Sequence, residues 1–336
     1  METLYRHIIK EAWQVVIKRP YLWFFGLFAA FFAGANEYSI IVNSTQIYQT
    51  GVPGVLASVL QTLRQTGLSN APLLKNLMKI WVKDPVALLS FFAFLILLLA
   101  AIVFVVWLIV VSQIALISAV QKISQNKNSE FNNQLRLGKS KFWPALGYNI
   151  LLKATIFLLV LVVVSLGLKL LTYGGTGLGL FLISYVLLII AMMILAFIIK
   201  FALCYLGLKD QNFLDSIISA IKLFKNHWLI CLEMALLVFL ISFVVGLILA
   251  VIVAALILPF LLLTYLTLLL KFVLGFFLTI TLAFILIFGV IAWVVAVLSA
   301  WQWSAWTLLF IKLDAEGATS KIVRLSKQLP NFFHAN

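Results

Sequence analysis

Six long apolar runs separate short polar segments along this chain. The runs cover residues 21–42, 85–120, 143–173, 177–208, 228–258 and 272–311. Each is predominantly apolar over about 20 residues or more, which is the length a helix needs to cross the hydrocarbon layer. None alternates apolar and polar residues as a barrel strand does. The pattern predicts an all-α integral membrane protein with six transmembrane helices.

Similar short sequence motifs recur at the ends of these runs. Three runs end with an alanine followed seven residues later by a lysine, at Ala115/Lys122, Ala202/Lys209 and Ala305/Lys312. Three begin with a lysine followed by aromatic residues and leucine, at Lys18, Lys141 and Lys225. The recurrence indicates three hairpin repeats within a single membrane domain. The repeats cover approximately residues 1–122, 137–209 and 213–312, with an outer loop at 43–84 and a cytoplasmic tail at 313–336.

Amphipathic segments accompany the hairpins. In the leader, Arg6, Lys10, Gln14 and Lys18 recur every fourth residue opposite an apolar face, and at 213–224 Ser216 and Lys222 lie opposite an apolar stripe. In the outer loop a lysine stripe lies opposite Leu74, Leu77, Met78 and Trp81; it consists of Lys75, Lys79 and Lys83. The pattern predicts interfacial helices on the lipid surface. The same periodicity also suits docking into a groove of a protein partner.

Composition excludes a soluble globular protein. The chain is 65% hydrophobic and 10% charged, with mean hydropathy +1.17, whereas soluble domains carry about 25% charged residues. Within the net charge of +14, most Lys and Arg fall in the N-terminal leader, the loop at 122–141, the segment at 209–225 and the C-terminal tail. This distribution places both termini in the cytoplasm. It favours anionic lipid headgroups as partners over nucleic acid.

The first apolar run has a second interpretation. Its core is followed by Ala33, Gly34 and Ala35, which resemble the cleavage site of a signal peptide. Cleavage there would leave five spans. The long amphipathic leader favours retention of the segment and hence the six-span interpretation.

A few polar residues lie within the predicted spans. Glu233 follows Lys225 by eight residues and Lys200 precedes Lys209 by nine, which places both about 12 to 14 Å from the same membrane face. Asn149 and Gln113 occupy the corresponding depths in another hairpin. We therefore expect an intramembrane polar layer in which Glu233 and Lys200 pair. Such residues line a pathway or binding site, or form a structural ion pair or extend to the headgroups.

Other chemistry is sparse. Cys204 and Cys231 lie in apolar runs, while His7, His227 and His334 are scattered; this distribution predicts no disulfide and no metal site. Apart from Glu37 near the end of the first run, Glu233 is the only acidic residue within a predicted span, so we expect no catalytic residues, no cofactor and no enzymatic activity. Tryptophans at predicted cytoplasmic ends suggest an aromatic belt: Trp143, Trp228, Trp301, Trp303 and Trp306.

The segment from Leu208 to Leu229, LKDQNFLDSIISAIKLFKNHWL, carries a family resemblance together with the three hairpins. It resembles the membrane domain attached to some bacterial glycerophosphodiester phosphodiesterases, and related stand-alone six-span proteins of unknown role. The barrel that carries hydrolase activity in that family has no counterpart here. The resemblance therefore implies a membrane module of a bacterial cytoplasmic membrane that is not a phosphodiesterase.

Two functions follow from these patterns. The first is a non-enzymatic multi-pass protein that binds lipid or a membrane or cytoplasmic protein partner. The alternative is a transporter or permease subunit that uses the polar layer around Lys200 and Glu233. Internal repeats and interrupted helices are common in transporters, although the spans hold few polar residues to line a hydrated path.

Overall fold

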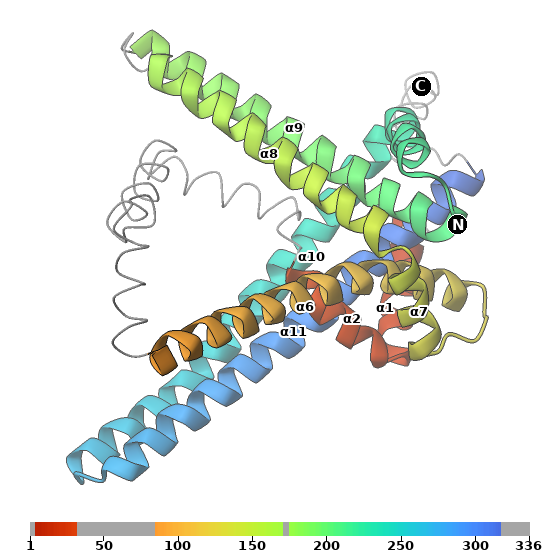
Figure 1. Cartoon of the computed structure of the whole chain (residues 1–336). Helices are drawn as coiled ribbons and strands as arrows, with labels where there is room; N and C mark the ends of the chain where they lie inside the picture. The colour runs from red at the N-terminus through yellow and green to blue at the C-terminus, as the bar shows by residue number, and fades with distance from the viewer. Residues whose placement is uncertain (1–3, 32–84, 171–174, 317–336) are drawn as a thin grey trace, which may run out of the picture. The chain divides into compact units, whose positions relative to one another are not determined.

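The computed structural model describes residues 4–31, 85–170 and 175–316, and in these ranges every regular element is an α-helix (Figure 1). The helices are α1 (Leu4–Lys18), α2 (Tyr21–Phe31), α6 (Pro85–Ser124), α7 (Phe131–Ser140), α8 (Phe142–Leu170), α9 (Gly175–Lys209), α10 (Phe213–Leu269) and α11 (Val273–Glu316). The lysine stripe of the outer loop lies outside the described residues.

Among the residues that the structure describes, five helices are long and apolar enough to cross a membrane: α6, α8, α9, α10 and α11. The protein is therefore built of multiple apolar helices, as a membrane protein is. The expected first span begins as α2, which is apolar over Tyr21–Phe31, but the rest of that run lies outside the described residues. The sixth span and the three-hairpin repeat accordingly stay predictions.

The chain divides into two compact units. In its described residues, the first unit comprises 4–31, 109–149 and 196–316. The second comprises 85–108, 150–170 and 175–195. The second unit consists of apolar helical segments with broadly exposed side chains, such as Phe94, Leu158 and Leu187. The compact core described below belongs to the first unit.

Three helix ends form the core of the first unit. Residues 109–120 of α6, 199–206 of α9 and 299–310 of α11 are buried without interruption. A helix that is buried on every side must be surrounded by other helices. The alanines of the repeated motif are each fully buried: Ala115, Ala202 and Ala305. Small residues at such positions allow helix backbones to approach closely.

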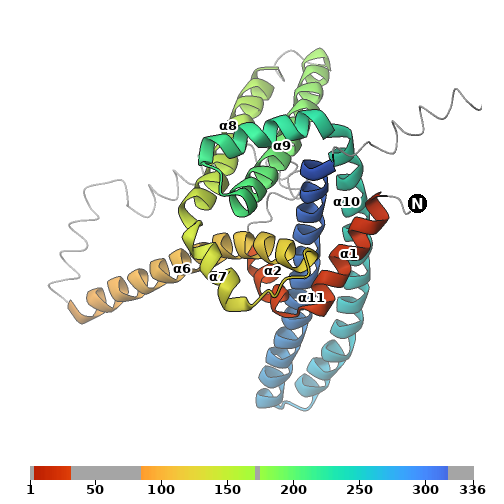
Figure 2. The same ribbon diagram turned by 90° about the vertical axis from the view of Figure 1, so that its right-hand side faces the viewer.

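The leader helix α1 packs on protein. It contacts α11, and its apolar side is buried, with Ile8, Ala12 and Val16 inaccessible. Figure 2 shows α1 alongside α10 and α11. The expectation that this apolar side is immersed in lipid is therefore wrong. Periodicity identifies an apolar side but not its neighbour, and here α11 covers it.

The helices α2 and α11 approach closely. A Cβ atom added at Gly26 would lie 2.2 Å from the carbonyl oxygen of Ala296, so the contact requires glycine. Trp23 and Trp293 meet edge to face at the same interface, with ring centres 5.9 Å apart. Further polar contact comes from the Tyr21 hydroxyl, which donates a hydrogen bond to Ser129 Oγ before α7 (2.7 Å).

Two sequence expectations about faces require correction. On the first part of α10, before the non-helical backbone at His227, Ser216 is fully buried while Leu214 and Ile218 are exposed. Tyr148 of α8 packs its ring on Phe213, and this contact directs the opposite side of the segment outward. Most of the expected aromatic belt also differs, because the core of the first unit encloses the tryptophans of α11: Trp301, Trp303 and Trp306.

Beyond this core, α10 and α11 continue together as a long helical hairpin (Figure 1). From Phe243 to Val295 every residue except Gly275 is at least partly exposed, and nearly all are apolar. The α10 helix continues through Pro259 to Leu269, and the chain turns at Lys271, whose φ is 52°. Water is an unfavourable environment for so much apolar surface, whereas lipid is a suitable one.

Candidate functional site

Two of the predicted polar residues meet inside the first unit. Asn149 Nδ2 on α8 donates hydrogen bonds to Gln113 Oε1 on α6 (2.9 Å) and to the carbonyl oxygen of Ala145 (2.9 Å). Both side chains are nearly inaccessible, with exposed fractions of 2% for Gln113 and 5% for Asn149. A buried amide pair of this kind satisfies polar atoms that would otherwise be costly in an apolar interior.

The two charged members of the predicted layer have contacts on further helices. Lys200 on α9 is buried, and its Nζ lies 4.8 Å from the ring centre of Trp306 on α11, in a cation–π arrangement. Glu233 on α10 accepts a hydrogen bond from the Tyr5 hydroxyl on α1. The first contact joins α9 to α11, and the second joins α10 to α1. Direct pairing of Glu233 with Lys200 stays a prediction.

A third buried polar contact was missed by the sequence analysis. Gln302 Nε2 on α11 donates a hydrogen bond to Ser242 Oγ on α10 (2.8 Å), and both residues are buried. In the sequence Gln302 lies between Trp301 and Trp303, which we had placed in an aromatic belt at the headgroups. The available signal was an amide within an otherwise apolar run.

Lysines at the polar ends of the helices join neighbouring elements. Lys209 Nζ on α9 lies 2.6 Å from Asp314 Oδ2 on α11. Lys141 Nζ donates to the carbonyl oxygens of Leu206 (2.8 Å) and Gly207 (3.0 Å) at the C-terminus of α9. A cation is favourable there because the last carbonyl groups of a helix lack backbone donors.

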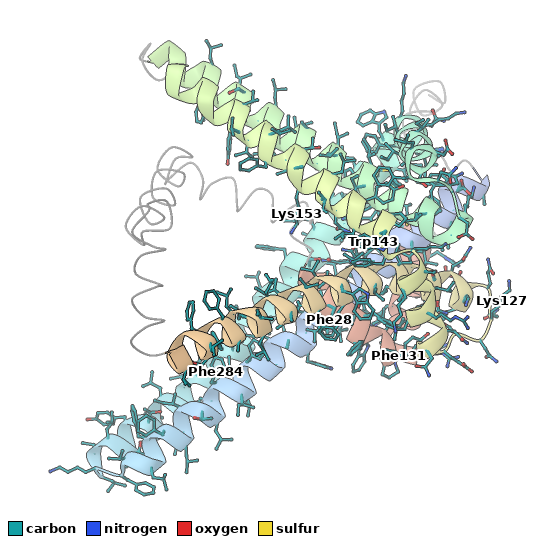
Figure 3. All side chains as sticks on the ribbon, viewed as in Figure 1. Phe28, Lys127, Phe131, Trp143, Lys153 and Phe284 are labelled. Carbon is teal, nitrogen blue, oxygen red and sulfur yellow. The ribbon has the colours of Figure 1, made fainter. Side chains whose placement is uncertain are left out.

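A cleft of about 560 Å³ opens on the same polar end of the first unit. One wall is the exposed side of α1 with Arg19 after it, and the other is the end of α6 with the residues that follow. Basic side chains outnumber acidic ones in its lining: Lys10, Lys18, Arg19 and Lys127. Figure 3 shows Lys127 on the connection between α6 and α7.

Within the described ranges, no three His, Cys, Asp or Glu residues lie close enough to hold a metal ion. Cys204 and Cys231 are buried as free thiols. Comparison with protein-family models, curated proteins and solved structures finds no match to this chain. Functional inference therefore depends on the arrangement of its own residues.

Proposed function

We propose that this chain is a non-enzymatic multi-pass protein of a bacterial cytoplasmic membrane that binds lipid or a membrane partner. The observation that carries the proposal is the hairpin of α10 and α11, whose residues from Phe243 to Val295 are nearly all apolar and, apart from Gly275, all at least partly exposed. Lipid is the solvent in which that surface is stable. The resemblance to membrane domains of bacterial phosphodiesterases supports the location.

The proposed orientation has both termini and the 122–140 connection in the cytoplasm. Exposed basic residues gather on the compact part of the first unit, including Lys18, Arg19, Lys127 and Lys222. In contrast, the turn of the α10–α11 hairpin carries Lys271 as its one basic residue. Short segments rich in Lys and Arg are retained on the cytoplasmic side.

Three hairpin repeats, each with two spans, account for several positions in the first unit. The alanines of the repeated motif, Ala115 on α6, Ala202 on α9 and Ala305 on α11, are each fully buried. In the same register, Gln113 corresponds to Lys200 and Asn149 corresponds to Glu233. Because Gln113 and Asn149 are hydrogen-bonded, a repeated architecture would bring Lys200 and Glu233 to the same relationship.

The first part of α10 supports lipid binding. Its exposed apolar side chains, Leu214, Ile218 and Ile221, are spaced to share one side of the helix. Lys222 and Lys225 on the same segment are also exposed. An amphipathic helix with this arrangement inserts its apolar side at the headgroup boundary while its lysines attract anionic lipid.

Extraction in polymer-bounded discs of native membrane tests the proposed role, because the discs retain the lipids and proteins around the chain. We expect anionic phospholipid to be enriched relative to bulk membrane, without phosphodiester hydrolysis by the purified protein. Replacement of Leu214, Ile218 and Ile221 by serine should reduce this enrichment. Lipid of bulk composition in discs of both proteins would contradict the lipid-binding role.

Transport is the second candidate, favoured by the burial of polar side chains at Gln113, Asn149 and Lys200. A permease subunit would use this layer as part of a substrate path. The same native discs distinguish the candidates, since stoichiometric recovery of an ATPase supports the permease. Recovery of a phosphodiesterase barrel protein supports the membrane-module role.

A further inference from the structure

The basic cleft of the first unit has one wall defined by the spacing of α1. Lys10, Gln14 and Lys18 recur every fourth residue and therefore share one side of the helix. The opposite side, with Ile8, Ala12 and Val16, is buried within the unit. Packing of α1 through its apolar residues thus fixes its polar side toward the cleft, where these three residues and Arg19 line the space.

The other wall is positioned by the end of α6. Asn126 has φ of 57°, and its backbone N–H donates to the carbonyl oxygen of Ile123 (3.0 Å). The N–H of Lys127 donates to the carbonyl oxygen of Lys122 (2.8 Å). This pair of bonds is a Schellman ending, and asparagine is one of the few residues that adopts its left-handed position readily. The turn places Asn126, Lys127 and Asn128 along the cleft.

The charges of the cleft are unbalanced. Four basic side chains line it, with Glu11 as its one carboxylate. Glu11 Oε2 already lies 3.3 Å from His7 Nδ1 and 4.0 Å from Lys312 Nζ. Among the described residues, Lys10, Lys18, Arg19 and Lys127 form no ion pair. A concave surface lined by one sign of charge concentrates counter-ions of the opposite sign.

We propose that this cleft binds an organic phosphate. The guanidinium of Arg19 offers planar paired donors that match phosphate oxygens. Lysine ammonium groups add charge, and the amides of Gln14, Asn126 and Asn128 can donate further hydrogen bonds. A volume of about 560 Å³ falls within the range of small-molecule pockets and accommodates more than a bare phosphate ion.

Two sources supply this chemistry: the headgroup of an anionic phospholipid, or a soluble phosphate ester of the cytoplasm. The headgroup suits the place of the cleft, because Arg19 lies two residues before the start of the apolar helix α2 and Asn126 lies two residues after the end of the apolar helix α6. The headgroup assignment rests on the proposed lipid-binding function, whereas recognition of phosphate itself does not.

Binding to the full-length protein in a neutral maltoside detergent tests the proposal by calorimetry. The probes are dioctanoyl phosphatidylglycerol, dioctanoyl phosphatidylcholine and glycerol 3-phosphate. The cleft variant combines Lys10→Gln, Arg19→Gln and Lys127→Gln. The control variant combines Arg136→Gln, Lys139→Gln and Lys271→Gln, which removes the same number of arginine and lysine charges from exposed positions outside the cleft. Thermal melting shows that each variant is folded, and Lys127→Gln alone replaces the triple variant if that unfolds.

We expect saturable binding of an anionic phosphate probe that weakens about tenfold or more in the cleft variant, because several charge-assisted hydrogen bonds are lost. The control should retain its affinity. Selective binding of phosphatidylglycerol supports the headgroup, and equal binding of glycerol 3-phosphate supports the soluble ester. The proposal is overturned if no anionic phosphate probe binds saturably, if phosphatidylcholine binds as tightly as the tightest anionic probe, or if binding weakens equally in both variants. This measurement is made in detergent, without a bilayer. Failure of the phosphate probes to bind would therefore not contradict lipid enrichment through α10, which the native discs measure separately.

Discussion

Buried polar side chains in the first unit connect specific pairs of helices. Asn149 bonds to Gln113 between α8 and α6, and Gln302 bonds to Ser242 between α11 and α10. The Tyr5 hydroxyl bonds to Glu233 between α1 and α10. In lipid, hydrophobicity does little to select which apolar helices pack together, because lipid chains are as apolar as leucine. Polar contacts of this kind therefore help to decide which helices become neighbours.

Pairing of Glu233 with Lys200 makes a prediction at this scale. Removing one partner of a buried ion pair costs about 3–5 kcal/mol, whereas replacing both with apolar residues costs little. Glu233→Leu and Lys200→Leu should each lower the thermal stability in detergent. The double variant should be more stable than the sum of the single effects predicts, which a double-mutant cycle measures.

Tyr5→Phe is the matched control for that cycle. It removes the hydrogen bond to Glu233 but leaves both charges in place, so it should show no comparable coupling with Lys200→Leu. Strict additivity of Glu233→Leu and Lys200→Leu would mean that the two side chains do not interact. Their effects would then come from the contacts with Tyr5 and Trp306.

At the scale of elements, packing on α11 holds helix α2 in place. It approaches α11 closely at Gly26, where the backbone of Ala296 leaves no space for a side chain. The Trp23 and Trp293 rings extend the interface. In an apolar environment such close backbone contact is a main source of attraction between helices.

Gly26→Ala should therefore destabilise the protein by about 1–3 kcal/mol, as overpacking generally does. A Cβ at Gly289 on α11 meets no atom within 4 Å, so Gly289→Ala is the matched control. That variant should be neutral or slightly stabilising, because alanine favours helix more than glycine does. Equal melting temperatures for the two variants in detergent would show that α2 does not pack closely on α11.

A second prediction at the scale of elements concerns the lysine stripe of the outer loop, which lies outside the described residues. We expect Lys75, Lys79 and Lys83 to rest on the outer leaflet with Trp81 immersed. In a synthetic peptide covering Ser69 to Asp84, tryptophan emission should shift to the blue on addition of anionic vesicles. Replacing the three lysines by Gln should weaken this binding in a salt-sensitive manner.

Trp81→Ser removes the apolar contact and should weaken binding to neutral and anionic vesicles alike, as followed by a fluorophore attached to the peptide. An unshifted emission of the unmodified peptide with both kinds of vesicle would contradict the lipid-facing stripe. The segment would then pack on the protein's own spans or on a partner.

At the scale of the whole molecule, the sequence predicted helices well and their faces less well. The run at 85–120 predicted most of α6 (Pro85–Ser124), because twenty apolar residues in succession leave the helix as the stable form in lipid. Burial of Ser216 and enclosure of Trp301 were not predictable in the same way. Each depends on which neighbouring helix covers the residue, and periodicity contains no information on that neighbour.

For the candidate sites too, the sequence identified the residues but not the neighbours that they meet. Gln113 and Asn149 were identifiable as polar residues at matched depth, and the hydrogen bond between them follows from the approach of α6 and α8. The basic side of α1 was equally visible in the spacing of Lys10, Gln14 and Lys18. Its use in a cleft was not, since the second wall comes from the ending of α6 more than a hundred residues later in the chain.

The central claim is that the chain threads a bacterial cytoplasmic membrane with six spans and both termini inside. Labelling of introduced cysteines in intact cells tests it most directly, in a background carrying Cys204→Ala and Cys231→Ala. A maleimide that cannot cross membranes should modify Gly51→Cys and Gly175→Cys, which lie outside in this topology, and should modify Asn128→Cys only after the membrane is permeabilised. Labelling of Asn128→Cys in intact cells, or protection of Gly51→Cys and Gly175→Cys, would contradict the account.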